Sequence, residues 1–189
     1  MLNITKYLTT REIVFISLMS ASLFVVNLVV GGAINAATGI PLSNAFFTAV
    51  TIGIWSMLMF KIVPKPGTFT LLLLIYSILE IPTSLGGAPG FWPKIPINVI
   101  TGLIGDLFLY LANYKRWSIY PAFYVLTTAN LIVFMLFLAL LKVPGTDKLI
   151  KIAPILIAVY WVVGSVGLFL GNIMYKRIEN KKVVRMIKT

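Results

Sequence analysis

The chain has 189 residues, of which 59% are hydrophobic, and its sixteen basic residues outnumber its five acidic ones. A soluble core of this size cannot bury so much apolar surface, so the composition excludes an ordinary soluble domain and indicates a membrane protein. No polar stretch is long enough to fold alone, so we expect a single transmembrane domain over residues 1–189. Cysteine and histidine are both absent, which excludes disulfides and removes the commonest general base and metal ligand. We therefore expect no catalytic residue, metal site or cofactor.

Six apolar segments are long enough to cross a bilayer, whose hydrocarbon core of about 30 Å needs about 20 helical residues. Inside the bilayer every backbone polar group needs an internal partner, so these segments are expected to be helices. Clusters of glycine and proline separate them, as at residues 64–67 and 86–90. The prediction is an all-α, six-helix transmembrane bundle with spans near Glu12–Gly31, Asn44–Val63, Phe69–Leu85, Ile95–Asn113, Trp117–Leu141 and Ala153–Tyr175.

The basic residues gather at one set of span ends. Twelve lie at the ends that also carry the two termini, and four lie at the other ends, namely Lys94, Lys142, Lys148 and Lys151. Basic residues favour the cytoplasmic side, so both termini are predicted to be cytoplasmic, with a basic tail over residues 176–189 near anionic lipid. Nucleic-acid binding is not expected, because this tail is short and has no interleaved aromatic residues.

The loops on the predicted outer face are moderately long, and they are rich in small and turn-forming residues. They are Gly32–Ser43, Gly86–Pro93 and Lys142–Ile152. The cytoplasmic loops are short and basic by comparison. Binding residues concentrate on variable loops, so a substrate is expected to arrive from outside.

Two carboxylates, Glu80 and Asp106, lie within the predicted hydrocarbon layer. A charge at the bilayer centre costs roughly 2.5–3.5 kcal/mol on insertion scales, so such residues usually face a bundle interior and serve a function. At a rise of about 1.5 Å per residue, Glu80 lies about 20 Å from Gly67, in the outer half of the layer. Asp106 lies about 15 Å from Pro96, near the predicted midplane. Tyr76 is one helical turn before Glu80 and shares its face.

Further polar residues accompany the two acids. Asn98, Gly102 and Asp106 follow one another at i, i+4 and i+8, which places them on one stripe of the fourth span. The small residues Gly102 and Gly105 leave room either for close helix packing or for a ligand. The other polar amides within spans are Asn27, Asn44 and Asn130.

For Glu80 we favour a ligand contact, because it lies near the outer loops and no basic residue inside the membrane is available to neutralise it. For Asp106 a structural role, such as a hydrogen bond to a neighbouring helix, is equally open. The aromatic residues of the outer half are candidates for stacking on a ligand, although such residues more often form an interfacial belt. The predicted substrate-binding residues are therefore Glu80, Tyr76, Asn98, Asp106, Trp92, Trp161 and Tyr160.

An unpaired carboxylate in a pocket prefers a cation or a strong hydrogen-bond donor, and nearby rings add cation–π attraction. The residues alone thus predict a small, aromatic or amine-bearing substrate that is neutral to cationic. An anionic substrate would need basic groups, and only the loop residue Lys94 is well placed to supply one.

The first span contains Ser17 and Ala21, which lie four residues apart on one face and form a small-xxx-small patch. Such a patch lets a partner helix approach closely, so we predict that a partner docks there. The sixth span has a second patch of small residues, which we interpret as internal packing; it consists of Gly164, Gly167 and Gly171.

A run of motifs in the middle of the chain carries a resemblance to a known family. A Lys-Pro-Gly turn at residues 65–67 is followed by Glu80, by the Gly/Pro-rich segment 86–90 and by the segment 102–106, Gly-Leu-Ile-Gly-Asp. With its six spans and small-xxx-small first helix, the chain resembles the substrate-binding S component of energy-coupling-factor (ECF) transporters. It is most similar to the subgroup that takes up thiamine or its hydroxymethylpyrimidine precursor, and to a related group of unassigned substrate. The motifs cover spans one to four, whereas spans five and six match only in hydropathy.

The chain departs from this pattern at three places. Asp106 stands where the family pattern has Glu, and residues 70–75 lack an extra acidic residue that the thiamine-precursor group can carry. The first-helix patch, usually Ala-xxx-Ala, begins here with Ser17. These differences leave the substrate open.

The resemblance implies a prokaryotic, multi-pass cell-membrane protein that binds a vitamin or vitamin precursor from outside. It implies docking through the first-helix patch onto a transmembrane coupling protein that is joined to two cytoplasmic ATPases. Toppling of the S component then presents the substrate inward. The chain has no Walker motif, so a partner would hydrolyse ATP, and this chain would be a binding subunit and not an enzyme.

Three other readings are weighed against this one. In a stand-alone proton-coupled transporter, Glu80 and Asp106 would form a proton relay, but such transporters usually contain inverted repeats and no convincing internal match is visible. In an intramembrane enzyme the two acids would form an acid–base pair, but no nucleophile accompanies them. A structural membrane protein without a ligand is the third.

Overall fold

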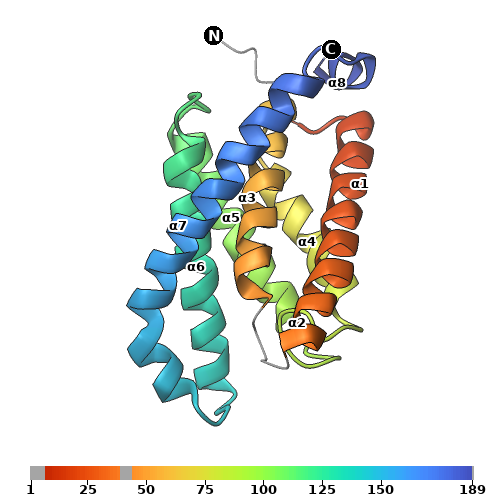
Figure 1. The fold of residues 1–189 in the computed structure, drawn as a ribbon. Coiled ribbons are helices and arrows are strands. Elements are labelled where there is room, and N and C mark those ends of the chain that lie inside the picture. Colours follow the sequence, from red (N-terminus) through yellow and green to blue (C-terminus); the bar gives the residue numbers. More distant parts are fainter. Residues whose placement is uncertain (1–6, 39–43, 189) are drawn as a thin grey trace.

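The structure is a computed structural model that describes residues 7–38 and 44–188, and every regular element in these ranges is a helix (Figure 1). In chain order the elements are α1 (Thr10–Val26), the π-helix η1 (Asn27–Gly31), α2 (Gly32–Thr38), α3 (Ala45–Ile62), α4 (Thr68–Glu80), α5 (Lys94–Leu111), α6 (Ile119–Leu140), α7 (Thr146–Ile178) and α8 (Lys182–Lys188). The all-α prediction holds for this part of the chain.

Five helical stretches are long and apolar enough to cross a membrane: α1–η1–α2 taken together, α3, α5, α6 and α7. The remaining apolar helix, α4, has 13 residues. Its length is therefore about 20 Å, which is shorter than a hydrocarbon core of about 30 Å. Six apolar helices are thus present in the described residues, but only five of them have the length of a full span.

The helices form one bundle in which α1 begins and α7 ends at the same end (Figure 1). We call this the terminal end, and we call the opposite end, which carries α2 and the α4–α5 connection, the loop end. Around the bundle α1 packs on α4, α4 on α5, α5 on α6 and α6 on α7, while α7 packs most extensively on the central α3. The predicted cytoplasmic side, which rests on the distribution of basic residues, corresponds to the terminal end.

The first helix is longer than predicted. It continues through η1 into α2 as far as Thr38, so the predicted end at Gly31 and a loop over the described residues 32–38 are wrong; residues 39–43 of that loop lie outside the described residues. The glycine pair does not break the helix because Gly32 keeps helical torsion angles, with φ −61°. Glycine permits a turn without enforcing one.

The third and sixth helices also differ from their predicted bounds. The third ends at Glu80 and not at Leu85, because proline at position 82 has no backbone N–H to donate the next helical hydrogen bond. The sixth begins at Thr146 and not at Ala153, directly after Gly145, which has φ +88°. Three of residues 147–151 are charged, so the apolar run starts only after them although the helix already includes them. Hydropathy alone therefore placed the start of the helix too late.

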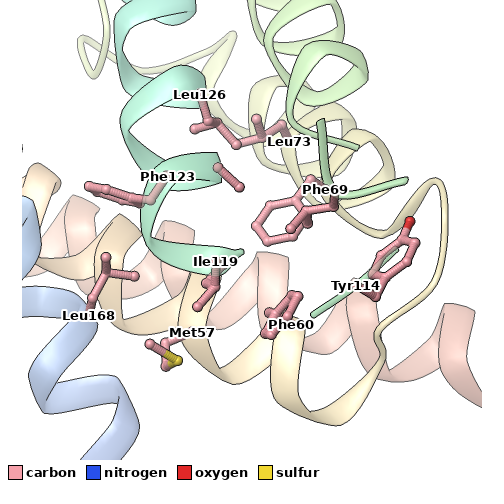
Figure 2. Close-up of a cluster of buried hydrophobic side chains, with 11 residues drawn as sticks. Met57, Phe60, Phe69, Leu73, Tyr114, Ile119, Phe123, Leu126 and Leu168 are labelled. Atoms are coloured by element: carbon pink, nitrogen blue, oxygen red, sulfur yellow. The ribbon is translucent and has the colours of Figure 1, made fainter. Parts of the chain in front are cut away.

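A buried cluster of apolar side chains joins α3, α4, α5, α6 and α7 (Figure 2). Where α3 meets α7, glycines bring the two backbones together: a Cβ added at Gly53 would lie 2.5 Å from the Gly164 carbonyl oxygen. One added at Gly171 would lie 2.7 Å from the Ile54 carbonyl oxygen. The interpretation of the glycine patch of the sixth span as internal packing is confirmed.

The basic tail is folded against the bundle in its described part. After α7 ends at Ile178, α8 turns back, and Val184 of α8 is buried in a second apolar cluster that includes Ile16 of α1 and Tyr175 of α7. This contact fixes the terminal end, so the region predicted as a tail contains a packed helix.

Candidate functional site

The Glu80 carboxylate lies at the loop end, at the last residue of α4, and only 5% of the residue is exposed. The loop backbone covers it: a Cβ added at Gly86 would lie 3.5 Å from Oε2 of Glu80. Gly86 has φ +63°, a conformation that favours glycine, so the backbone angle explains the absence of a side chain at this position. The Gly-rich connection therefore closes directly over the acid.

One series of hydrogen bonds reaches Glu80 from α3 and η1. The Thr51 hydroxyl donates to Asn27 Oδ1 (2.8 Å), and Asn27 Nδ2 donates to the Tyr76 hydroxyl oxygen (3.1 Å). The Tyr76 hydroxyl in turn hydrogen bonds to the Glu80 carboxylate. Asn27 is the first residue of the π-helix η1 and is fully buried. Gly31 is the other buried residue of that turn. The extra residue of a π turn locally shifts the faces of a helix, and such turns often occur at functional sites.

A second series reaches Glu80 from the opposite side. Asn130 Nδ2 of α6 donates to Asn98 Oδ1 of α5 (3.3 Å), and the Asn98 side chain hydrogen bonds to Glu80. The same Asn130 amide is 3.3 Å from the hydroxyl oxygen of Thr101, which is fully buried. Both series therefore direct their donors toward one carboxylate, and five helical elements contribute to it.

Lys94 corrects the expectation that no basic residue is available to Glu80. It is the first residue of α5, is 3% exposed, and interacts electrostatically with the Glu80 carboxylate. Its Nζ donates to the backbone carbonyls of Glu80 (3.0 Å) and Thr83 (2.8 Å), so it also satisfies carbonyls at the C-terminus of α4. A cation at a helix C-terminus is favourable because the helix dipole is negative there.

Asp106 is held against a helix backbone at the other end of α4. Its Oδ1 accepts from the Phe69 amide (3.1 Å), and its Oδ2 accepts from the Thr70 amide (2.8 Å) and hydroxyl (2.7 Å). The residue before α4, Gly67, has no side chain to cap the helix, so Asp106 provides the cap from α5. Gly102 permits this approach, since a Cβ there would lie 2.6 Å from Thr70 Cα. Of the two roles left open for Asp106, the contacts favour the structural one, and the small residues beside it serve packing.

Replacement of Asp106 by Ala is expected to lower stability and to leave ligand affinity unchanged. The change removes the acceptor for two buried amides, at a cost of about 1–3 kcal/mol for each unsatisfied group. Thermal unfolding in one detergent should show a lower Tm, with a smaller shift for Asp106→Asn, which keeps one acceptor oxygen. An unchanged Tm combined with weaker ligand binding would contradict the structural role.

The two acids occupy opposite ends of α4, since Asp106 contacts residues 69 and 70 whereas Glu80 ends the helix. Ten residues of helix separate these points, which is about 15 Å along the axis. Asp106 therefore lies toward the terminal end of α4, and the two carboxylates do not form a hydrogen-bonded pair.

A comparison with known protein families shows to which family the chain belongs. Residues 10–151, which are 142 of its 189 residues (151 − 10 + 1), match a family described as a hypothetical bacterial integral membrane protein, Trep_Strep. The chain belongs to the Trep_Strep family. It is therefore a bacterial integral membrane protein, in agreement with the predicted multi-pass membrane location. No curated protein and no solved structure matches it.

We call Glu80, Lys94 and the residues of the two hydrogen-bond series the Glu80 cluster. The matched region of this Trep_Strep chain contains every residue of that cluster, whereas most of α7 lies beyond the matched region. The predicted aromatic residues are not brought to that cluster by any contact that we observe. Trp92 is 61% exposed and its ring meets Phe137 at 6.5 Å, edge to face. Trp161 is 40% exposed, donates to Thr128 Oγ1 (3.1 Å), and lies on α7 with Tyr160. Contact of these residues with a substrate stays a prediction.

The docking patch of the Trep_Strep chain lies beside an exposed face of α1. Ser17 and Ala21 are half-buried, and their neighbours Val14 (53%) and Leu18 (66%) are exposed. The Ser17 hydroxyl donates to the Ile13 carbonyl (2.8 Å), so it places no unsatisfied polar group on this face. Docking of a partner there stays a prediction.

Sequence reasoning missed Thr51, Lys94, Thr101 and Asn130 as members of the cluster. Asn27 and Asn130 were visible as amides inside apolar runs, but hydropathy gives no information about which helix faces meet. Lys94 carried a signal of its own, since it is a basic residue at the predicted outer end of a span, where basic residues are scarce.

Proposed function

We propose that this chain is the membrane-embedded, high-affinity substrate-binding subunit of an ECF-type importer. Its substrate would be a vitamin or vitamin precursor, with thiamine and hydroxymethylpyrimidine as the first candidates. The partners would be a transmembrane coupling protein and two cytoplasmic ATPases, and the chain itself would perform no covalent chemistry.

The observation that carries the proposal is the convergence of donors on Glu80. Its carboxylate is 5% exposed, and a tyrosine hydroxyl, an asparagine amide and the Lys94 ammonium all act on it. Buried polar networks are costly in a membrane unless every member is satisfied, so such a cluster is seldom kept without a role. Stability does not require it, because an apolar core of the same shape would avoid the desolvation cost altogether.

A ligand would reach this cluster from the loop end. The connection over Glu80 is poorly packed: Pro82, Ser84, Gly86 and residues 88–90 are exposed. Two hollows in the described residues do not border Glu80: one is an apolar gap between α4, α5 and α6 with no room for a water molecule, and the other, of about 260 Å³, lies beside α8. Binding therefore requires movement of the exposed residues 88–90 of this connection, while the Thr83 carbonyl keeps its hydrogen bond from Lys94.

The docking face supplies the second element of the proposal. Within the bundle α1 packs mainly on α4 and less on α3, and it carries the small residues Ser17 and Ala21 beside exposed apolar side chains. In a membrane, small residues allow a partner helix to approach closely, so the coupling protein would contact this face.

Replacement of Ala21 by Leu is expected to leave substrate affinity intact and to reduce uptake by cells that express the complete transporter. The added side chain would hold a partner helix away from the patch, whereas Glu80 lies on another helix. The matched control is Ala158→Leu, which adds the same volume to an exposed position of α7. Normal uptake by the Ala21→Leu variant, or an equal loss with Ala158→Leu, would contradict docking at this face.

The proposal as a whole is tested with gently purified protein. Native mass spectrometry identifies what copurifies, and calorimetric titration with hydroxymethylpyrimidine and with thiamine measures affinity. Submicromolar binding of either compound is the expected result. Absence of a copurified small molecule together with absence of binding of both compounds would refute the binding function. Uptake by vesicles that contain this chain alone would instead favour a stand-alone transporter.

A further inference from the structure

The charge of the Glu80 cluster bears on which ligands it can accept. Among the residues observed to act on the carboxylate, the one that carries a full charge is Lys94. Its ammonium is held at Glu80 itself, because Nζ donates to the Glu80 carbonyl oxygen at 3.0 Å. The other contributors, such as Tyr76 and Asn98, are polar but uncharged. The cluster therefore places one basic side chain beside one acidic side chain.

Lys94 cannot move away from Glu80 easily. The residue is 3% exposed. Its ammonium donates a second hydrogen bond to the carbonyl of Thr83 (2.8 Å), which lies in the connection that follows α4. The backbone of that connection also packs on the lysine stem, since a Cβ added at Gly87 would lie 3.8 Å from Lys94 Cε. The positive charge is thus a fixed part of the site.

Hydrogen bonds stabilise the Glu80 carboxylate in addition to the positive charge of Lys94. The series through Asn27 and Tyr76 and the series through Asn130 and Asn98 both end with a donor directed at Glu80. An ionised Glu80 is therefore already stabilised by the protein from two sides. An incoming cation would give up its hydration shell without meeting an unbalanced negative charge, which is costly in a buried site. An uncharged molecule gives up less hydration and can exchange hydrogen bonds with the same amides and hydroxyls.

We infer that the Glu80 site selects an uncharged, hydrogen-bonding heterocycle over a cation, and that Lys94 is the residue that sets this preference. The inference rests on the proposed binding function and narrows its substrate class. It narrows the expectation of a neutral-to-cationic ligand, which depended on an uncompensated carboxylate, to the neutral case. Removal of the lysine charge exposes the charge of Glu80 and shifts the preference toward cations.

The test uses two ligands that differ in one group. Hydroxymethylpyrimidine is the uncharged probe, and its aminomethyl analogue, in which an ammonium replaces the hydroxyl, is the cationic one. Both are titrated into the purified full chain at a pH at which the amine is protonated and the alcohol is uncharged. The wild type should bind the alcohol at least tenfold more tightly. In Lys94→Gln, which keeps a donor for the carbonyls of residues 80 and 83 without the charge, the ratio should fall at least tenfold.

The matched control is Lys65→Gln, since Lys65 also pairs with a buried glutamate, Glu12 (2.9 Å), but at the terminal end. This variant should leave the ratio unchanged. Tighter binding of the amine by the wild type, or an unchanged ratio in Lys94→Gln, overturns the inference while the binding function stands. Failure of both probes and of thiamine to bind refutes the proposed function instead.

A second measurement needs no ligand and applies even if Lys94→Gln folds poorly. Thermal unfolding of Glu80→Gln, Lys94→Gln and the double variant forms a thermodynamic cycle. Each single variant leaves one buried charge without its partner, so the double variant should be more stable than additive losses predict. Additive losses of Tm would overturn the pairing of the two charges.

Discussion

Replacement of Glu80 by Gln is expected to weaken ligand binding at least tenfold, which corresponds to about 1.4 kcal/mol. Glutamine keeps the shape of the side chain, but its amide group offers donors where Tyr76 and Asn98 already donate, and it leaves the Lys94 charge unbalanced. The cost therefore combines lost acceptors with an uncompensated buried cation. Calorimetric titration of hydroxymethylpyrimidine into wild type and variant measures the change.

The matched control for this variant is Glu12→Gln. Glu12 is also 5% exposed and also pairs with a lysine, but it lies in the first turn of α1, where it caps that helix together with Thr9. Its replacement should lower Tm and leave ligand affinity unchanged. An unchanged affinity of Glu80→Gln, or an equal loss in both variants, would show that Glu80 does not contact the ligand.

Replacement of Gly167 by Ala is expected to cause a large loss of stability. The new methyl group would overlap the Val50 carbonyl oxygen and lie 2.9 Å from the Val50 carbonyl carbon, and these backbone atoms cannot rotate aside. The α3–α7 contact would have to open along its length. Overpacking of this kind costs about 1–3 kcal/mol or more, so a fall of Tm by several degrees is expected in detergent.

The control is Gly32→Ala, the same substitution at a helical glycine with open space around it. A Cβ at Gly32 has no neighbour within 4 Å, and its φ of −61° suits alanine. Alanine is favoured over glycine within a helix by roughly 0.5–1 kcal/mol, so the Tm of this variant should be unchanged or higher. An equal response at the two glycines would mean that α3 and α7 do not pack closely.

The bounds of the helices show where sequence reasoning succeeds and where it fails. The predicted spans 44–63, 95–113 and 117–141 lie within two residues of α3, α5 and α6 at both ends. At both ends of each of these helices, the sequence becomes more polar and also contains residues that favour turns. The first and sixth helices were misjudged because glycine at 31–32 and charge at 147–151 each supply only one of these two signals.

In the candidate site, too, sequence reasoning identified some residues and not others. Glu80 was recognisable because a carboxylate inside an apolar run is costly wherever it points. Tyr76 and Asn98 were predicted beside it, but Thr51, Lys94 and Asn130 were not, because they matter only through the faces on which their helices meet. The same limit applied to Asp106, which has the same intramembrane signal as Glu80 but caps the N-terminus of α4 from a position 36 residues away.

The sequence by itself determined that this chain is a helical membrane protein, where most of its helices lie, and that Glu80 requires an explanation. These properties follow from local quantities, namely apolar length, turn residues and the cost of burying a charge. Only the tertiary structure decided that Lys94 balances Glu80, that Asp106 supports a helix end and that α4 is shorter than a full span. Each depends on contacts between helices, and in a membrane those contacts are set by close packing and hydrogen-bond partners that a hydropathy pattern does not encode.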